Sequence, residues 1–121
     1  MKSEFSSKLS NRFPDIFNLN NSSNIFYFEC HEGWFDLMFQ LCEELEELAV
    51  KENVNLPKIA QVKEKFGKLR IYLDSGTDTM HNRVSEFEKI SGFVCEICGG
   101  VGKQMTENSW IKTRCSNHIS V

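Results

Sequence analysis

Apolar side chains recur along this chain with two different periods, and each period indicates a type of element. The strongest helical pattern runs from Gly33 to about Asn53, where apolar residues follow one another at intervals of three or four. It predicts an amphipathic helix of about 20 residues, which Pro57 stops. The apolar stripe consists of Trp34, Leu37, Met38, Leu41, Leu45 and Leu48, and it is widened by Phe35, Cys42 and Ala49.

Weaker patterns precede this helix. Apolar residues between Glu4 and Phe13 lie at helical spacing and predict a short helix, which ends near Phe13 because the residue before Pro14 avoids helical geometry. Residues 18–24 are polar and predict a loop. The segment 25–30, IFYFEC, is rich in β-forming residues and predicts a buried strand, or an extended segment laid on the core.

Beyond Pro57 the period changes to two. Residues 59–74 alternate around Phe66 and Gly67, which predicts a β-hairpin with glycine in the turn. The loop 74–78 can cap a following helix, which Gly92 ends. The apolar stripe of that helix is Met80, Val84, Phe87 and Ile90. These elements predict an α+β fold, with a long amphipathic helix packed on a small antiparallel sheet.

Metal-ligating residues near the C-terminus have a regular spacing. Cys95 and Cys98 form a Cys-x2-Cys pair that Gly99 follows, and after sixteen intervening residues Cys115 and His118 form a Cys-x2-His pair. Each pair can direct two ligands at one point, and a strand over residues 110–114 can return the chain to it. Four soft or borderline ligands leave no open position, so the pattern predicts a structural zinc site. An iron–sulfur centre is the alternative.

The predicted zinc site also explains how the C-terminal segment folds. So short a segment buries little apolar area, whereas structural zinc contributes about 10–16 kcal/mol in small modules. The length of 121 residues suits a single domain. We divide it into an N-terminal helix and loop (1–24), an α+β core (25–92) and a zinc-ribbon-like knuckle (93–121).

Composition narrows the class of protein. Five cysteines without a secretion signal favour reduced thiols and metal over a disulfide framework. No apolar run approaches the roughly 20 residues that a membrane span needs, so we expect a cytoplasmic protein without a membrane partner. The net charge of −3 argues against a chain whose whole surface binds nucleic acid, but it allows a local basic surface.

Four motifs, in this order, carry a resemblance to a known family. They are GWFDL at Gly33–Leu37, QVKEKFGKLRIY at Gln61–Tyr72, CEICG at Cys95–Gly99 and WIKTRCSNH at Trp110–His118. Together they resemble a family of small, largely uncharacterised proteins of bacteria and their phages. The resemblance spans roughly residues 30–118 and implies a zinc-binding α+β domain. It also suggests an accessory or counter-defence protein that inhibits a host system, acting in the bacterial cytoplasm.

Two oppositely charged stretches are candidate binding surfaces. Five bases and one acid lie between Lys58 and Arg70, whereas eight acids and one base lie between Glu29 and Asn53. The acidic stretch could dock on a basic partner and the basic one on phosphates, although both patterns also occur on simply solvated faces. The contact residues that we expect are Glu43, Glu44, Glu46, Glu47, Lys63, Lys65, Lys68 and Arg70.

From these surfaces we expect a protein–protein interaction module with a host or phage protein as its partner. The alternative is a nucleic-acid-binding zinc protein that uses the basic hairpin 58–72 together with Lys112 and Arg114.

The third hypothesis is that the protein is an enzyme, and we expect that it is not. Cys30, His31, Glu32, Asp36 and His81 could build a second metal site for a hydrolase. However, adjacent residues of an extended chain point apart, and no phosphate loop, nucleophile elbow or HExxH motif is present. Cys42 lies on the apolar stripe and is expected in the core.

Overall fold

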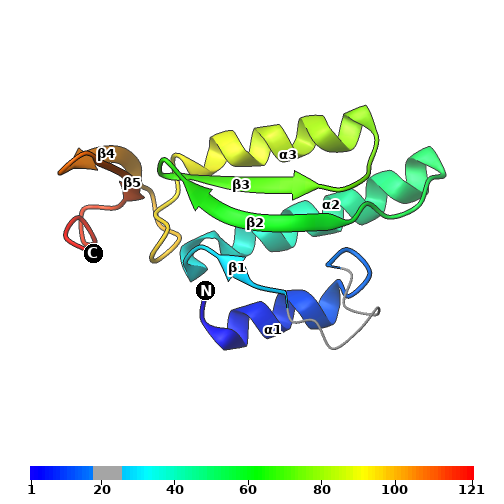
Figure 1. Cartoon of the computed structure of the whole chain (residues 1–121), viewed down its shortest axis with the longest axis horizontal. Helices are drawn as coiled ribbons and strands as arrows, with labels where there is room; N and C mark the ends of the chain where they lie inside the picture. The colour runs from blue at the N-terminus through cyan, green and yellow to red at the C-terminus, as the bar shows by residue number, and fades with distance from the viewer. Residues whose placement is uncertain (18–25) are drawn as a thin grey trace.

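Helices cover one face of a small sheet, and a second hairpin closes the C-terminal end of the chain (Figure 1). The computed structural model describes residues 1–17 and 26–121, so the predicted loop 18–24 lies outside the described residues. In chain order the elements are α1 (Ser3–Arg12), β1 (Phe28–Glu29), the 3-10 helix η2 (Glu32–Trp34), α2 (Phe35–Glu52), β2 (Ile59–Lys65), β3 (Lys68–Leu73), α3 (Asp78–Ser91), β4 (Lys103–Glu107) and β5 (Trp110–Arg114). The predicted α+β class is confirmed.

The three-stranded sheet has the order β1-β2-β3 and mixed direction. Strands β2 and β3 pair antiparallel as predicted, whereas β1 runs parallel to β2 with Phe28 opposite Val62. The parallel pairing arises because α2 carries the chain back before β2 begins. Of the described residues 26–30 of the predicted strand, Phe28 and Glu29 form β1.

The turn between β2 and β3 is a tight two-residue connection. Phe66 and Gly67 both have positive φ, 53° and 80°, as a type I′ hairpin turn requires. The Gly67 N–H donates to the Glu64 carboxylate at 2.7 Å. Phe66 is a bulky residue in a left-handed conformation, which costs about 1–2 kcal/mol, so the turn depends on contacts elsewhere to hold it.

The apolar core lies between the sheet and helices α2 and α3. Trp34, Met38, Leu41 and Leu45 are fully buried, as the helical stripe predicts, and so is Cys42. From the sheet and from α3 the core receives Val62, Leu69, Ile71, Met80, Val84 and Phe87. Ile90, the last residue of the predicted α3 stripe, is exposed instead.

Helix α3 begins at a capped end and closes an edge of the sheet. The Thr77 hydroxyl oxygen accepts the Met80 N–H at 3.3 Å, so the predicted capping loop is confirmed. Along α3, Ser91 Oγ accepts the Leu69 N–H and the Glu88 carboxylate accepts the Ile71 N–H, each at 2.9 Å. Because these side chains satisfy the outer edge of β3, a further strand cannot add there.

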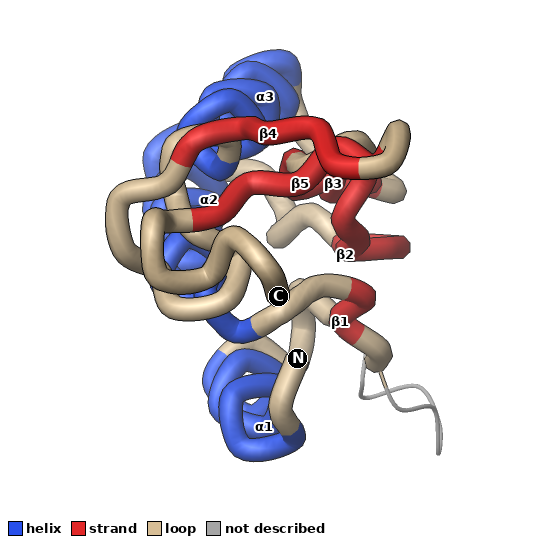
Figure 2. Tube along the Cα trace, turned by 90° about the vertical axis from the view of Figure 1, so that its left-hand side faces the viewer, coloured by secondary structure: helices blue, strands red, loops and turns tan. Residues whose placement is uncertain are grey.

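The other face of the sheet is open. Figure 2 shows the helices α2 and α3 on one side of strands β2 and β3, and no described element covers the opposite side. This open face carries the side chains that alternate with the buried ones, which are Gln61, Lys63 and Lys65 of β2 and Arg70 and Tyr72 of β3. None of the described helices has the length and apolar character that crossing a membrane requires.

Candidate metal centre and charged surfaces

Two tight turns hold the four predicted metal ligands. Cys95 and Cys98 lie in the turn after α3, where the Gly99 N–H donates to the Cys95 carbonyl at 2.9 Å. Gly99 has a φ of 82°, a left-handed conformation that favours glycine. The second turn follows β5, where the His118 N–H donates to the Cys115 carbonyl at 3.1 Å. The β4–β5 hairpin returns the second turn to the first.

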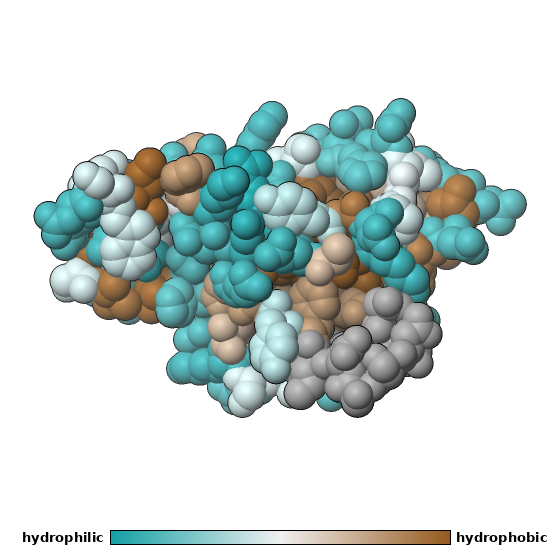
Figure 3. Space-filling view, in the orientation of Figure 1, coloured by the Kyte–Doolittle hydropathy of each residue, from teal (hydrophilic) through white to brown (hydrophobic). Residues whose placement is uncertain are grey.

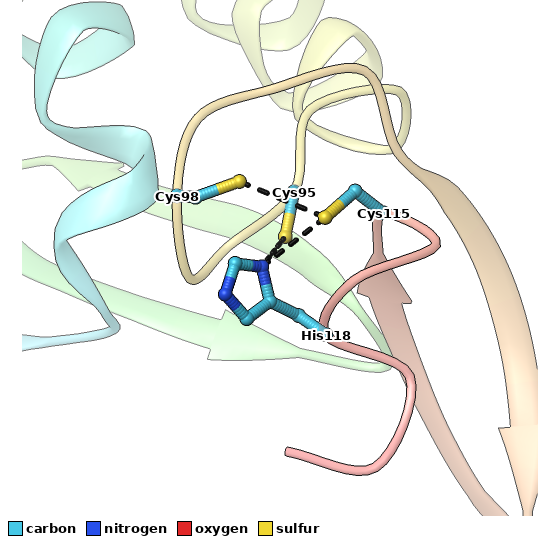
Figure 4. Close-up of side chains that lie close together, drawn as sticks. All are labelled: Cys95, Cys98, Cys115 and His118. Atoms are coloured by element: carbon cyan, nitrogen blue, oxygen red, sulfur yellow. Dashed lines mark hydrogen bonds between the residues drawn. The ribbon is translucent and has the colours of Figure 1, made fainter.

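The four side chains converge on one point (Figure 4). Sγ of Cys98 and Sγ of Cys115 are 3.7 Å apart, and Nδ1 of His118 lies 3.1 Å from Sγ of Cys115 and 3.8 Å from Sγ of Cys95. All four ligand atoms lie within 4.8 Å of one another. Thiolates at about 2.3 Å from a tetrahedral ion would be separated by about 3.8 Å. The cluster therefore fits a single four-coordinate metal ion.

Hydrogen bonds from the backbone favour the ionised form of the Cys95 thiol. Burial alone would raise the pKa of Cys95, but hydrogen bonds from the backbone of Cys98, Cys115 and Ile97 outweigh it and lower the pKa to about 6. A thiolate at neutral pH is the form that binds a metal cation.

The knuckle (93–121) docks on the start of α2 through close backbone contacts. The Gly33 N–H donates to the Glu96 carbonyl at 2.7 Å, and Trp34 Nε1–H donates to the Val94 carbonyl at 2.8 Å. A Cβ atom on Gly33 would collide with the carbonyl oxygens of Cys95 and Glu96. Because residue 33 is a glycine, the turn that holds Cys95 and Cys98 can lie directly against η2.

A buried ion pair lies beneath the same turn. The Glu96 carboxylate accepts the His31 N–H at 3.0 Å and pairs with Arg114 Nη1 at 3.2 Å. Both side chains are buried, so each charge depends on the other. Nearby, the Thr113 hydroxyl donates to the Gly67 carbonyl at 2.5 Å and ties β5 to the strained β2–β3 turn.

This burial corrects one part of the nucleic-acid hypothesis. Lys112 and Arg114 are each only 2% exposed, so neither presents its charge to a phosphate backbone. Lys112 Nζ contacts the Val121 carbonyl at 3.2 Å and the Glu107 carboxylate at 3.4 Å. Both cations hold the knuckle together. The sequence did not predict the burial of Lys112 and Arg114, because their contacts follow no periodic pattern along the chain.

Some acidic residues of α2 form ion pairs within the fold, and others face solvent. Glu44 pairs with Arg83 of α3 at 2.7 Å, and Glu46 pairs with Arg12 of α1 through both carboxylate oxygens. Glu43 remains exposed, and so does Glu47. The ion pairs of the described residues do not join this acidic stretch to the basic hairpin.

Lys63, Lys65 and Arg70 lie on the open face of the sheet, whereas the stem of Lys68 lies against Gly92 at the end of α3. Lys63 lies directly opposite Arg70, and Lys65 lies opposite Lys68. Within the described chain these four cations form no ion pair. Glu29 is the parallel partner of Lys63 and adds one negative charge to this face. Figure 3 views this face and shows hydrophilic side chains gathered over the turn end of the hairpin.

The residues proposed for a second metal site do not come together. Among the described residues, the one group of three or more potential ligands is Cys95, Cys98, Cys115 and His118. His31 and His81 are exposed, and Cys30 is buried. Burial raises the pKa of Cys30 to about 12, which leaves it a protonated, unreactive thiol at neutral pH.

Fold and site together define an α+β protein with a Cys3His cluster suited to a metal ion. No family model, curated protein or solved structure matches the chain.

Proposed function

We propose that this chain is a zinc protein that binds nucleic acid on the open face of its three-stranded sheet. The observation that carries the proposal is a set of four cations on the hairpin, Lys63, Lys65, Lys68 and Arg70, which form no ion pair with any other described residue. The zinc ion stabilises the knuckle and takes no part in a reaction.

Zinc is the metal that suits the donor set. Three sulfurs and one imidazole nitrogen, at distances that fit one tetrahedral ion, match the soft and borderline ligands of structural zinc sites. An iron–sulfur cluster would need room for bridging sulfides between its thiolates. Because four protein ligands complete the coordination, the ion has no open position for a substrate.

The arrangement of the cations favours an anionic partner. Like charges directly opposite each other on a sheet are destabilising, by a few tenths of a kcal/mol up to about 1 kcal/mol per pair. The hairpin has two such pairs, Lys63 with Arg70 and Lys65 with Lys68. A polyanion on this face would remove both repulsions.

The net charge of −3 does not oppose this assignment, because the acidic side chains of α2 lie on a different layer of the molecule from the hairpin cations. Glu43 and Glu47 are exposed on α2, whose buried residues face the sheet from the other side. At physiological ionic strength, charges further apart than about 8 Å are largely screened from each other.

Salt dependence tests the proposal. We expect the full-length protein to bind labelled oligonucleotides with a log–log salt slope of about −3 for single strands, because four cations contact phosphates. Lys63→Gln with Arg70→Gln should halve the slope. The matched control is Lys51→Gln, which removes a lysine of α2 outside the face. If no oligonucleotide binds even at low salt, the proposal is wrong.

A protein partner on α2 is a second candidate function. Glu43, Glu47 and Val50 recur at helical spacing on its exposed side, and Val50 is 83% exposed. An inhibitor of a host system, which the family resemblance suggests, would be an interaction of this kind. Capture from host lysate that Glu43→Gln with Glu47→Gln abolishes, and Lys63→Gln leaves intact, would support it.

A further inference from the structure

A hollow lies on the open face beside the cations. Its volume is about 430 Å³, and it is lined by Phe26, Tyr27, Glu29, Ala60, Gln61 and Tyr72. Ala60 and Gln61 belong to the middle strand and form the floor, while the aromatic residues come from β3 and from the segment leading into β1.

The aromatic rings of this face are exposed to solvent. Tyr27 is 71% exposed and Tyr72 is 43% exposed, and at the far end of the hairpin Phe66 is 65% exposed. Lys63 Nζ lies 5.7 Å from the centre of the Tyr72 ring, and Lys65 Nζ lies 5.8 Å from that of Phe66. Each of these two lysines therefore already lies against a ring.

We propose that this hollow is a subsite for an unpaired nucleobase, and that the nucleic acid bound on the face is single-stranded. The inference rests on the proposed function and names its substrate class. A base stacks on Tyr72, with Tyr27 as the second wall, and Lys63 and Arg70 hold the phosphates on either side of it. Gln61 and Glu29 offer hydrogen-bonding groups to the edge of the base.

The shape of the face favours a single strand over a duplex. Exposed rings beside cations are the means by which proteins bind single strands, since the faces of unpaired bases are free to stack. In a duplex those faces are already stacked on neighbouring bases. No described helix projects from the open side of the sheet, so the face offers no helix for insertion into a major groove.

The test compares four probes on the full-length zinc-loaded protein by fluorescence anisotropy. The probes are a labelled 20-nucleotide single strand, its duplex, an abasic strand with the same phosphates, and a mononucleotide. We expect the single strand to bind roughly 5- to 150-fold more tightly than the abasic strand, the range that one stacked base supplies. The mononucleotide should bind more weakly than the single strand because it meets fewer cations.

Variants separate stacking from charge. Tyr72→Leu should lower affinity for the single strand by about the same factor and leave affinity for the abasic strand unchanged, whereas Tyr72→Phe keeps the ring and should restore binding. Equal melting temperatures of the two variants would exclude an effect of folding. Lys63→Gln should weaken the binding of all three polymers alike.

The outcomes distinguish the two proposals. If the abasic strand and the duplex bind as tightly as the single strand, the base subsite is wrong while phosphate binding on the face stands. If Tyr72→Leu and Tyr72→Phe behave alike, the base subsite is again wrong. If no nucleic acid binds but an acidic protein does so through Lys63 and Arg70, both proposals fail.

Discussion

The two ends of this molecule are held together by different forces. The helices and the three-stranded sheet share one apolar cluster, to which Trp34, Leu41 and Leu45 contribute fully buried side chains. In the knuckle the buried residues of β5 are Lys112, Thr113 and Arg114, and β4 buries none. One region is stabilised by apolar area and the other by hydrogen bonds, an ion pair and a Cys3His group suited to a metal ion.

This difference teaches how a short segment folds without a core of its own. Phe93, Val101 and Trp110 are apolar but exposed, so the knuckle gains little from burying them. Four ligands that converge on one ion can supply the missing stabilisation. The knuckle then covers Gly33 and holds the strained β2–β3 turn through Thr113 and Gln104.

Removing a metal ligand should have the largest effect, because the knuckle depends on the metal and the apolar region does not. We expect Cys98→Ser to abolish metal binding and to unfold residues 93–121, a loss on the order of 10 kcal/mol in binding free energy. Hydrogen exchange should show loss of protection in β4 and β5 while α2 keeps most of its own. Cys42→Ala, which removes a cysteine outside the cluster, is the control and should keep the metal. A knuckle that stays protected without metal would contradict the account.

Removing one partner of the buried ion pair should have the next largest effect. Glu96→Gln leaves the Arg114 charge buried without a carboxylate, and we expect about 3–5 kcal/mol of destabilisation. Chemical denaturation followed by circular dichroism measures it. The double variant Glu96→Leu with Arg114→Met removes both charges and should recover most of that loss. Equal destabilisation by the single and double variants would show that the charges do not depend on each other.

The apolar region should respond to cavities instead. Leu45→Ala removes a fully buried side chain of α2 and should cost about 2–5 kcal/mol. Val50→Ala on the same helix should change stability by less than about 0.5 kcal/mol, because Val50 is exposed. Thermal melts of both variants with metal bound provide the measurement. Similar costs at the two positions would mean that the helix does not bury the face described.

Thiol reactivity should distinguish the two regions without changing stability. Burial raises the pKa of Cys42, so its thiolate fraction at neutral pH is smaller than that of a free cysteine. With metal bound, we expect all five thiols to react slowly with a disulfide reagent at pH 7. After chelation Cys95, Cys98 and Cys115 should react, whereas Cys42 stays protected. Rapid reaction of Cys42 under both conditions would place it outside the core.

Patterns in the sequence predicted the elements whose contacts join residues close together in the chain. The stripe on α2 and the β2–β3 hairpin follow from periodicity within a few residues, and the strand 110–114 follows from the need to return the second ligand pair to the first. The four potential ligands also come together as their paired spacing predicts. In each case the interacting residues belong to one element or to two short turns.

Contacts between distant segments were not predictable in this way. The parallel pairing of β1 needs α2 to return the chain, and the burial of Lys112 and Arg114 needs the rest of the knuckle to pack around β5. Both depend on how finished elements pack, which no period in the sequence encodes. Charge counts likewise did not show that Glu44 and Glu46 are used by α3 and α1, while the hairpin cations face solvent.

The claim that the Cys3His group binds one zinc ion is tested most directly by X-ray absorption at the zinc edge, with metal content measured on the same purified sample. The account predicts one zinc ion per chain, bound by three sulfurs at about 2.3 Å and one nitrogen at about 2.0–2.1 Å. A metal-free sample whose C-terminal hairpin is fully ordered, or a zinc ion surrounded by oxygen, would contradict it.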